Sequence, residues 1–578
     1  MGDSIVYNEE EVIGVGSSGT YVFRGYVQHT TRARHAVAVK RIQRPPGEEG
    51  RELLKLVERE VELLTALNQS PRVPFFHCWG ITSSHVFIAL ELCTESLREH
   101  VARRGASMPV ERRMEILRSV AAGIAWLHDP NKPSGCITHN DLKPENLLVD
   151  STGAVKIADV GLGVQLQVGR GDEYTMSTFR KYGIDIVLAG RAPEMLRHLP
   201  LTPAADIWAM GVVFYFVLTG RASPFSESGR DVPTDTAIIN GRHHLQTLMH
   251  VPGLRPRRAL ESRHLLASML APAPESRPDA AGVTSHPLFW DDERMMDQVT
   301  ALHARSASLQ RDLGATLSNV ATEALLAGAD AGNSERGALL AAATMDLVDW
   351  KRMVDDAILT RVTTAHVGPG PAAGGGRSKT DVGRKPYGDG FADLLRFCRN
   401  AYEHPPTGHE VEPIVAALAE AERAERAEAK AKAVSAAAAR RAQAQAQARA
   451  RGDDGDARGD EDEIESETAD EPLDTEEGSG VGEARSFSLL PPGISPGGAH
   501  RRLTRKQRKA LFAAYVAHLF PGLPLAVYEC QAAIGPDVAR GARRGGRGGG
   551  RGGGNGAGNG NAQAAAAAAE TPSRTSNR

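Results

Sequence analysis

The sequence predicts an α+β protein with a small β-rich lobe, a larger α-helical lobe and then a second, all-helical unit. Three observations predict this architecture. Short β-branched runs come first, at residues 21–23, 36–42 and 86–90. Longer stretches with helical spacing of apolar residues follow, at residues 51–67, 110–127 and 203–219. Helical patterns then continue from about residue 291 to residue 412. Strands before helices indicate that the two kinds of structure form separate lobes.

Composition excludes several classes of protein. The 578 residues carry a net charge of −3, so any electrostatic case for binding nucleic acid or a membrane must be local. Five scattered cysteines without C-x-x-C spacing argue against a zinc ribbon or a disulfide scaffold and fit a reducing compartment. The N-terminus lacks a signal-peptide pattern, and the longest apolar run, 207–219, is shorter than the roughly 20 residues of a membrane span. The sequence as written therefore predicts a cytoplasmic chain without a membrane segment.

The first glycine-rich motif lies between two strand-like segments. Gly14, Gly16 and Gly19 form a G-x-G-x-x-G pattern that a strand follows, which favours a hairpin closing over phosphates rather than a dinucleotide site. Lys40 stands in an apolar strand about 20 residues later, and Glu60 on the next helical stretch is spaced to pair with it. These residues predict a nucleotide site.

The next motifs supply charged groups in a fixed order. They are His139-Asn-Asp141-Leu-Lys143-Pro-Glu-Asn146, Asp159-Val-Gly161, Ala192-Pro193-Glu194, Asp206-Ile-Trp208-Ala-Met-Gly211 and Arg277-Pro278. Together with the glycine-rich motif they resemble the eukaryotic protein kinase fold over residues 9–290. The two lobes predicted above are the bilobal arrangement of that fold.

The kinase resemblance implies ATP and Mg²⁺ as cofactors and gives each residue a role. Lys40, held by Glu60, orients the α and β phosphates. Asn146 and Asp159 hold Mg²⁺ through oxygen atoms. Asp141 accepts the proton of the substrate hydroxyl, and Lys143 neutralises the γ phosphate. A Lys at this position of the loop is typical of Ser/Thr kinases. The resemblance also makes Glu194 and Arg277 a buried structural ion pair.

Two positions depart from the kinase pattern. Asn140 replaces the usual Arg before the catalytic Asp, a residue that receives the activation-loop phosphate, so this control is expected to be weakened. Val160 replaces the usual Phe after the metal-binding Asp, and packs less against the helix that carries Glu60. Thr175, Ser177 and Thr178 lie where kinases of this type carry their phosphosites.

A second set of motifs follows the kinase region. Its members are Asp349-Trp350-Lys351, Tyr387, Asp393 to Asn400, His404, Leu519-Phe520-Pro521 and Tyr528. This order resembles the kinase-extension nuclease (KEN) domain of two families, the inositol-requiring kinase/endoribonuclease of the unfolded protein response and ribonuclease L. The resemblance implies RNA cleavage without a metal. Tyr387 is the base, His404 the acid, and Arg399 and Asn400 bind the phosphate.

The resemblance also implies partners and a location. They are a back-to-back homodimer or higher oligomer, phosphorylation of itself in trans, an RNA substrate in mRNA splicing or decay, and the cytosolic side of the endoplasmic reticulum if an anchor precedes this sequence. Ala401, where the family has Lys, and Glu403 and Pro405, which flank His404, depart from the nuclease pattern and weaken phosphate attraction.

The predicted domain boundaries follow composition. We expect a kinase domain at 1–290, the first part of the nuclease domain at 291–412, a disordered low-complexity insertion at 413–499, the rest of the nuclease domain at 500–535 and a disordered Arg/Gly-rich tail at 536–578. Three functions stay open: a dual kinase and ribonuclease, a kinase whose KEN domain dimerises without cleaving RNA, and a non-enzymatic RNA-binding scaffold that uses the tail. The basic run 501–509 and the tail fit nonspecific RNA contacts and a solvated helix start with a linker-like tail equally well.

Overall fold

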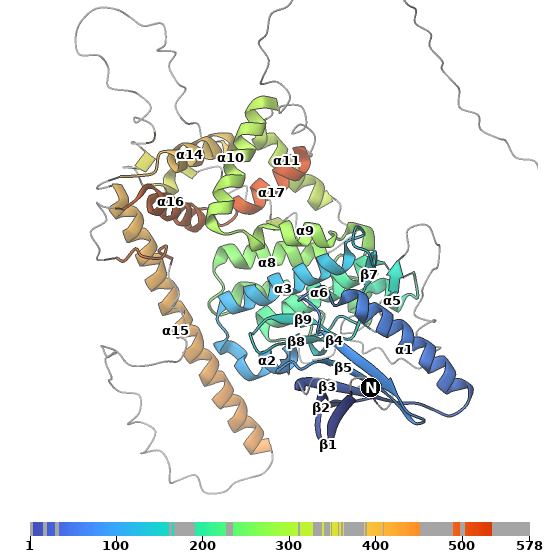
Figure 1. The fold of residues 1–578 in the computed structure, drawn as a ribbon. Helices are drawn as coiled ribbons and strands as arrows, with labels where there is room; N and C mark the ends of the chain where they lie inside the picture. The colour runs from blue at the N-terminus through green and yellow to red at the C-terminus, as the bar shows by residue number, and fades with distance from the viewer. Residues whose placement is uncertain are drawn as a thin grey trace, which may run out of the picture. The chain divides into compact units, whose positions relative to one another are not determined.

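The computed structural model shows two lobes followed by a helical extension (Figure 1). Residues Met1–Ala533 form one compact unit. The structure describes residues 4–15, 20–28, 34–160, 164–166, 191–200, 202–226, 235–309, 312–326, 338–339, 341, 347, 350–355, 358–359, 362, 387, 390–407, 410–450, 489–496 and 503–534.

The first lobe is a five-stranded antiparallel sheet with the strand order β1-β2-β3-β5-β4 and one helix, α1. The two faces of the sheet follow from the alternation of side chains along each strand. Val37, Val39 and Ala89 are buried on one face, while Val86 and Ile88 pack with α1 on the other. The bounds are β1 Ser4–Val15, β2 Tyr21–Gln28, β3 Arg34–Gln43, α1 Glu48–Leu67, β4 Phe76–Ile81 and β5 His85–Glu91.

The second lobe is mainly helical, with two small sheets ordered β6-β8-β9 and β10-β7. Its bounds are β6 Glu95–Ser96, α2 Leu97–Arg104, η1 Gly105–Ser107, α3 Val110–His128, β7 Cys136–Thr138, η2 Pro144–Asn146, β8 Leu147–Val149, β9 Val155–Ile157, β10 Val164–Leu166, α5 Pro193–Leu196, α6 Pro203–Thr219, α7 Asp235–Ile239, η5 Leu245–His250, α8 Pro256–Met269, η6 Pro274–Ser276, α9 Ala280–Ser285 and η7 Pro287–Phe289. The bilobal α+β prediction is confirmed.

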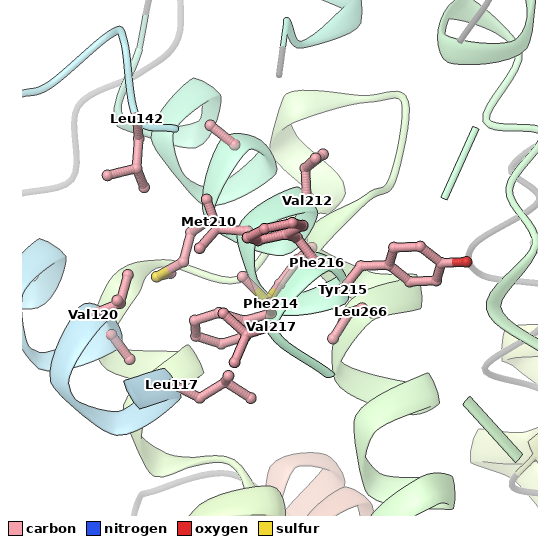
Figure 2. Packing of buried hydrophobic residues seen from close by; sticks show 14 of the residues in the cluster. Leu117, Val120, Leu142, Met210, Val212, Phe214, Tyr215, Phe216, Val217 and Leu266 are labelled. Atoms are coloured by element: carbon pink, nitrogen blue, oxygen red, sulfur yellow. The ribbon is translucent and has the colours of Figure 1, made fainter. Parts of the chain in front are cut away.

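Helix α6 is the centre of the second lobe. Fourteen of its 17 residues are buried, so the apolar run 207–219 is a core helix. Figure 2 shows its side chains among Leu117 and Val120 of α3 and Leu266 of α8. Gly211 allows a close approach, because a Cβ there would lie 3.0 Å from Leu270 Cδ2 and 3.2 Å from the Cβ of Met269. The position of α6 is thus fixed by packing on several sides.

The extension is a helical unit with an aromatic core. Its bounds are α10 Asp292–Leu309, α11 Leu313–Leu326, η8 Trp350–Met353, α14 Phe391–Glu403, α15 Val411–Ala450, α16 Arg505–Leu519 and α17 Leu523–Ile534. Helices α10, α14 and α16 pack against one another. Trp350, Phe397 and Phe512 are buried between them, with ring centroids 5.0 Å apart for Trp350 and Phe397 and 6.2 Å for Phe397 and Phe512.

The predicted disordered insertion at 413–499 is wrong at both ends. Residues 413–450 lie within helix α15, and its first turns pack on α16. Ile414 and Leu418 are buried there, one helical turn apart. Leu489 is also buried, and its backbone N–H donates to Glu422 Oε2 at 3.3 Å. The low complexity of the Ala-rich sequence hid this short apolar stripe. Residues 451–488 lie outside the described part of the chain.

No single helix in the described ranges is long and apolar enough to cross a membrane. The helices α16 and α17 meet the length and composition criteria only as a pair, with a 90° bend between them.

Helix α17 docks on the second lobe through a buried polar chain. His264, His286 and Glu529 are each at most 2% exposed. Leu288 N–H donates to His286 Nδ1 at 3.1 Å, so a neutral His286 carries its proton on Nε2 and donates it to His264 Nδ1 at 3.0 Å. A neutral His264 then carries its proton on Nε2, 3.1 Å from Glu529 Oε1. The contacts of these three side chains join α8 and η7 of the second lobe to α17 of the extension.

Replacing Glu529 tests this junction. Glu529→Ala removes the acceptor facing the buried Nε2 hydrogen of His264 and is expected to lower the free energy of unfolding by about 1–3 kcal/mol. Glu529→Gln keeps an amide oxygen in the same place and should lose less. Denaturant unfolding of the whole chain measures both. Wild-type stability in Glu529→Ala would contradict the inferred contact.

Candidate functional site

Three charged side chains meet between the two lobes. Lys40 of β3 lies 3.0 Å from Glu60 Oε1 of α1 and 2.9 Å from Asp159 Oδ1. Burial alone would lower the pKa of Lys40, but the carboxylates of Asp159 and Glu60 outweigh it and raise the pKa above its ordinary value. Lys40 therefore stays a cation, as binding of phosphate requires. The spacing prediction for Lys40 and Glu60 agrees with this contact.

Asp159 is held as an anion at this point. The Lys40 ammonium holds the pKa of Asp159 below its ordinary range, against the opposing effect of burial, and His139 and Lys143 add smaller contributions. Asp159 has a backbone φ of 58°, an uncommon conformation for a residue other than glycine. Val160 after it is only 2% exposed and belongs to the core of the second lobe, so the smaller side chain is fully packed.

The loop between β7 and β8 brings three further groups together. Lys143 Nζ donates to Asp141 Oδ2 at 2.7 Å. Asn146 Nδ2 donates to the backbone oxygen of Asp141 at 2.8 Å and to its Oδ2 at 2.9 Å. Because these two acceptors take the amide nitrogen, the Asn146 amide oxygen is the atom left for a cation. An amide oxygen and the Asp159 carboxylate are donors that suit Mg²⁺.

A buried carboxylate holds this loop in place. Asp206, 1% exposed at the start of α6, accepts from the backbone N–H groups of His139 at 2.7 Å and Asn140 at 2.8 Å. It also lies 2.8 Å from His128 Nε2. Burial would raise the pKa of Asp206, but the hydrogen bonds and charges of His128 and His139 outweigh burial and lower it. This role of Asp206 was not assigned from the sequence, although its motif was noted.

Asn140 fits the backbone that Asp206 imposes. Its φ is 63°, in the left-handed region where Asn is better tolerated than most residues. Its amide Nδ2 donates to Thr138 Oγ1 at 3.0 Å, so this short side chain bends back into the lobe. A long cationic side chain that could receive a phosphate is absent at this position.

Of the glycines and phosphosites predicted for the kinase, the structure describes only Gly14. Gly14 lies in β1, which pairs with β2 as the predicted hairpin does, with Val15 opposite Tyr21. Gly16, Gly19, Thr175, Ser177 and Thr178 lie outside the described residues.

The Glu194–Arg277 pair is structural, as the resemblance implied. Arg277 donates to Glu194 Oε1 at 2.6 Å and to Oε2 at 2.8 Å, and both side chains are at most 2% exposed. Arg277 also donates to the backbone oxygens of Ala271 and Ala204 and lies over the Trp208 ring. The pair joins α5 to the core of the second lobe.

The extension gathers three of the four predicted nuclease residues. Asn400 Nδ2 donates to the Tyr387 hydroxyl at 2.6 Å, and Arg399 donates to Asn400 Oδ1. The Tyr387 ring packs edge-on against Trp350 and Phe397, which fixes its position. Arg399 Nε is buried and has no hydrogen-bond partner among the described residues. A hydroxyl, an amide and a guanidinium with donor capacity left over therefore converge on one place.

His404 stands one helical turn beyond Asn400. It ends α14, and its backbone N–H donates to the Asn400 carbonyl at 3.0 Å. Its side chain is exposed. The neighbouring Glu403 carboxylate lies 3.9 Å from both Arg505 and Lys509 of α16, so its charge is partly balanced. Ala401 is fully buried, on the side of α14 that faces the core.

Two residues near this cluster received no role from the sequence. Arg396 lies over the Tyr387 ring, with its Cζ 4.5 Å from the ring centroid. Burial, followed by the charges of Arg399 and Arg396, lowers the pKa of His303 on α10. His303 is 93 or more residues away from these arginines in the chain, and only the packing of α10 on α14 brings them near. Helical periodicity around His303 would have located the helix but not its partner.

Comparisons with known proteins agree with the kinase half of this description, and the relatives' names carry both a kinase and an endoribonuclease. Residues 7–289 match the protein kinase domain family. The serine/threonine-protein kinase/endoribonuclease IRE2 of Homo sapiens is 34% identical over 303 residues, covering 50% of this chain and 29% of that protein. The IRE1 proteins named serine/threonine-protein kinase/endoribonuclease in Oryza sativa subsp. japonica and Caenorhabditis elegans are each 30% identical, over 51% of this chain and 31% and 28% of their own lengths. The chain spans less than a third of the length of these relatives.

Breaking the Glu194–Arg277 pair is expected to destabilise the second lobe. Glu194→Ala leaves a buried guanidinium without its counter-charge, at an expected loss of about 3–5 kcal/mol in the free energy of unfolding. The exposed pair between Arg51 and Glu48 provides the control, because Glu48→Ala removes only a surface ion pair and a charge at the start of α1 and should cost about 1 kcal/mol or less. Denaturant unfolding followed by circular dichroism compares the two variants. Similar losses would show that Glu194 is not specially placed.

Proposed function

Since residues 7–289 form a protein kinase domain in a chain that resembles the kinase/endoribonucleases, we propose that this protein is both an ATP-dependent Ser/Thr protein kinase and a metal-independent endoribonuclease. The observation that carries the kinase half is the contact of Lys40 with Glu60 and Asp159, because it assembles the phosphate-binding cation beside the metal ligand. The cluster of Tyr387, Asn400 and Arg399 supports the ribonuclease half.

The kinase residues act by placing charge. Lys40 binds and orients the α and β phosphates of ATP, and Glu60 holds Lys40 in position. Asp159 and the Asn146 amide oxygen would hold Mg²⁺, which would supply positive charge to the phosphates. Asp141 receives the proton of the substrate hydroxyl, and Lys143, 2.7 Å from Asp141, neutralises charge on the transferred phosphate.

The ribonuclease residues act by proton transfer and phosphate binding. Tyr387 removes the proton of a 2′-hydroxyl, whose oxygen then attacks the adjacent phosphorus. The Asn400 amide donates to the phenolic oxygen that carries charge once Tyr387 has lost its own proton. Arg399 binds the phosphate, and His404 gives a proton to the departing 5′-oxygen. The products are a 2′,3′-cyclic phosphate and a free 5′-hydroxyl.

A kinase whose extension dimerises without cleaving RNA is the second candidate. The buried Ala401 and the Glu403 carboxylate favour it, because one cation is missing and an anion stands next to His404. The two candidates differ in a single measurable activity. Both share an expected back-to-back homodimer or higher oligomer that phosphorylates itself in trans.

The wider setting rests on the resemblance of the motifs to the kinase/endoribonuclease of the unfolded protein response. A kinase/endoribonuclease of this kind would act on RNA in an unfolded-protein-response-like pathway, through unconventional mRNA splicing or RNA decay. It would stand on the cytosolic side of the endoplasmic reticulum if a membrane anchor precedes the sequence.

Autophosphorylation tests the kinase half. Asp159→Asn removes a metal-binding charge and should abolish incorporation of phosphate from labelled ATP and Mg²⁺ at Thr175, Ser177 or Thr178. Chelating Mg²⁺ should have the same effect on the wild type. Exposed Glu48→Gln on α1 is the control and should label normally. If Asp159→Asn incorporates as much phosphate as the wild type, the phosphoryl-transfer site is assigned to the wrong residues.

Cleavage of a stem-loop RNA in EDTA tests the ribonuclease half. His404→Ala should lose about 10²- to 10⁴-fold in rate because it lacks the acid for the leaving oxygen. Its kinase activity should persist, since His404 lies outside the two lobes. Asp141→Ala should show the converse. Full cleavage by His404→Ala would exclude this residue as the acid, and a wild-type dimer that never cleaves would favour the second candidate.

A further inference from the structure

Helix α16 begins with a group of cations on one face. Arg505, Arg508 and Lys509 stand at relative positions i, i+3 and i+4, so their side chains are neighbours on the helix surface. Lys506 adds an exposed cation beside them. None of the 15 residues of α16 is an aspartate or glutamate. The start of α16 is therefore strongly positive.

This arrangement does not serve the helix itself. The first turn of a helix carries partial positive charge from its free N–H groups, which favours acidic residues there and disfavours cations. Thr504 and Gln507 form a capping box that satisfies two of these N–H groups. Helix stability therefore gives no reason for three or four cations at this end, and an external anion does.

The cations stand directly beside the candidate nuclease site. Arg505 donates to the backbone oxygen of Glu403 at 2.8 Å, and Lys509 Nζ lies 4.3 Å from the centre of the Tyr402 ring. His404, the candidate acid, directly follows Glu403 in the chain. The Glu403 carboxylate lies 3.9 Å from Arg505 and from Lys509. Asp297, Glu293 and Asp291 also act on Tyr402, where they add to burial in raising its pKa, so they offset part of the positive charge of this face.

The cations of α16 compensate for the Lys that the nuclease pattern has at position 401 of α14. At position 401 the buried Ala401 supplies no positive charge for RNA. Arg505 and Lys509 of α16 reach the end of α14 and supply positive charge there instead. Cations three and four residues apart lie about 5–6 Å apart at their Cβ atoms, close enough to contact neighbouring phosphates of one strand. A polymer with a charge at every nucleotide fits such a row.

We propose that Arg505, Arg508 and Lys509 form a second phosphate-binding surface for the RNA, adjoining the cleavage site, with Glu403 as a counter-charge that weakens it. The proposal rests on the ribonuclease function proposed above and assigns the binding surface for RNA next to the cleaved phosphate. RNA displaces the Glu403 carboxylate from Arg505 and Lys509 when it binds.

The test measures RNA binding separately from cleavage. The probe is a 2′-O-methyl stem-loop RNA, which lacks the attacking hydroxyl, titrated with the full chain in EDTA at several salt concentrations. The double variant Arg505→Gln/Lys509→Gln should bind about tenfold more weakly near 0.1 M salt. Its slope of log K against log salt should fall by about 1.4, since each single-strand phosphate contact contributes about 0.7.

Two further variants make the result specific. Arg51→Gln/Lys55→Gln removes the same charge from an exposed i, i+4 pair on α1 and should bind RNA like the wild type. Glu403→Gln should bind more tightly. Phosphate labelling of each variant confirms that it is folded.

Each outcome decides a different point. An unchanged slope in the α16 variant, an equal loss in the α1 variant, no RNA binding by the wild type, or binding of anionic lipid vesicles in place of RNA would each overturn the proposal. Binding that depends on Arg505 and Lys509, in a chain that does not cleave the natural 2′-hydroxyl RNA, would reject the ribonuclease function and leave the binding surface standing.

Discussion

The catalytic loop depends on the position of one buried carboxylate, that of Asp206. A carboxylate removed from water is costly unless donors surround it, and three donors do so here, two of them successive backbone N–H groups. The loop can present both N–H groups only if it bends at Asn140, and that bend directs Asp141 and Asn146 to the same side. Since Asp206 lies in the first turn of the helix at the centre of the second lobe, packing around α6 sets the geometry of the proposed phosphoryl-transfer site.

Much of the kinase half could be predicted because its signals are local. The strands alternate, α6 is continuously apolar, and Lys40 and Glu60 belong to adjacent elements, so pattern and spacing were sufficient. The reason for Asn140 could not be predicted. It depends on a left-handed backbone and on a hydrogen bond to Thr138, and both follow from the tertiary position of Asp206 rather than from neighbouring residues.

The extension was less predictable because its site is assembled from distant segments. The contact of Tyr387 with Asn400 agrees with the order of motifs, but His303 and Arg505 reach the site only through the packing of α10 and α16 against α14. From the sequence alone, Glu403 was expected to repel the RNA phosphate. In the structure two cations more than 100 positions later, Arg505 and Lys509, lie 3.9 Å from its carboxylate. Low complexity also hid the apolar start of α15, where few large residues in an Ala-rich run suffice for packing.

The junction at α8 determines how the two proposed activities can influence each other. Arg258 donates to the backbone oxygens of Leu288 and Trp290, Arg257 pairs with Asp292 at the start of α10, and His264 faces Glu529. Within the described residues, the second lobe and the extension are thus in direct contact through α8. A nucleotide that moved the second lobe would therefore also act on the proposed ribonuclease surface through these contacts. Communication between the two proposed sites then depends on these packed contacts and less on the length of the chain that connects the lobe to the extension.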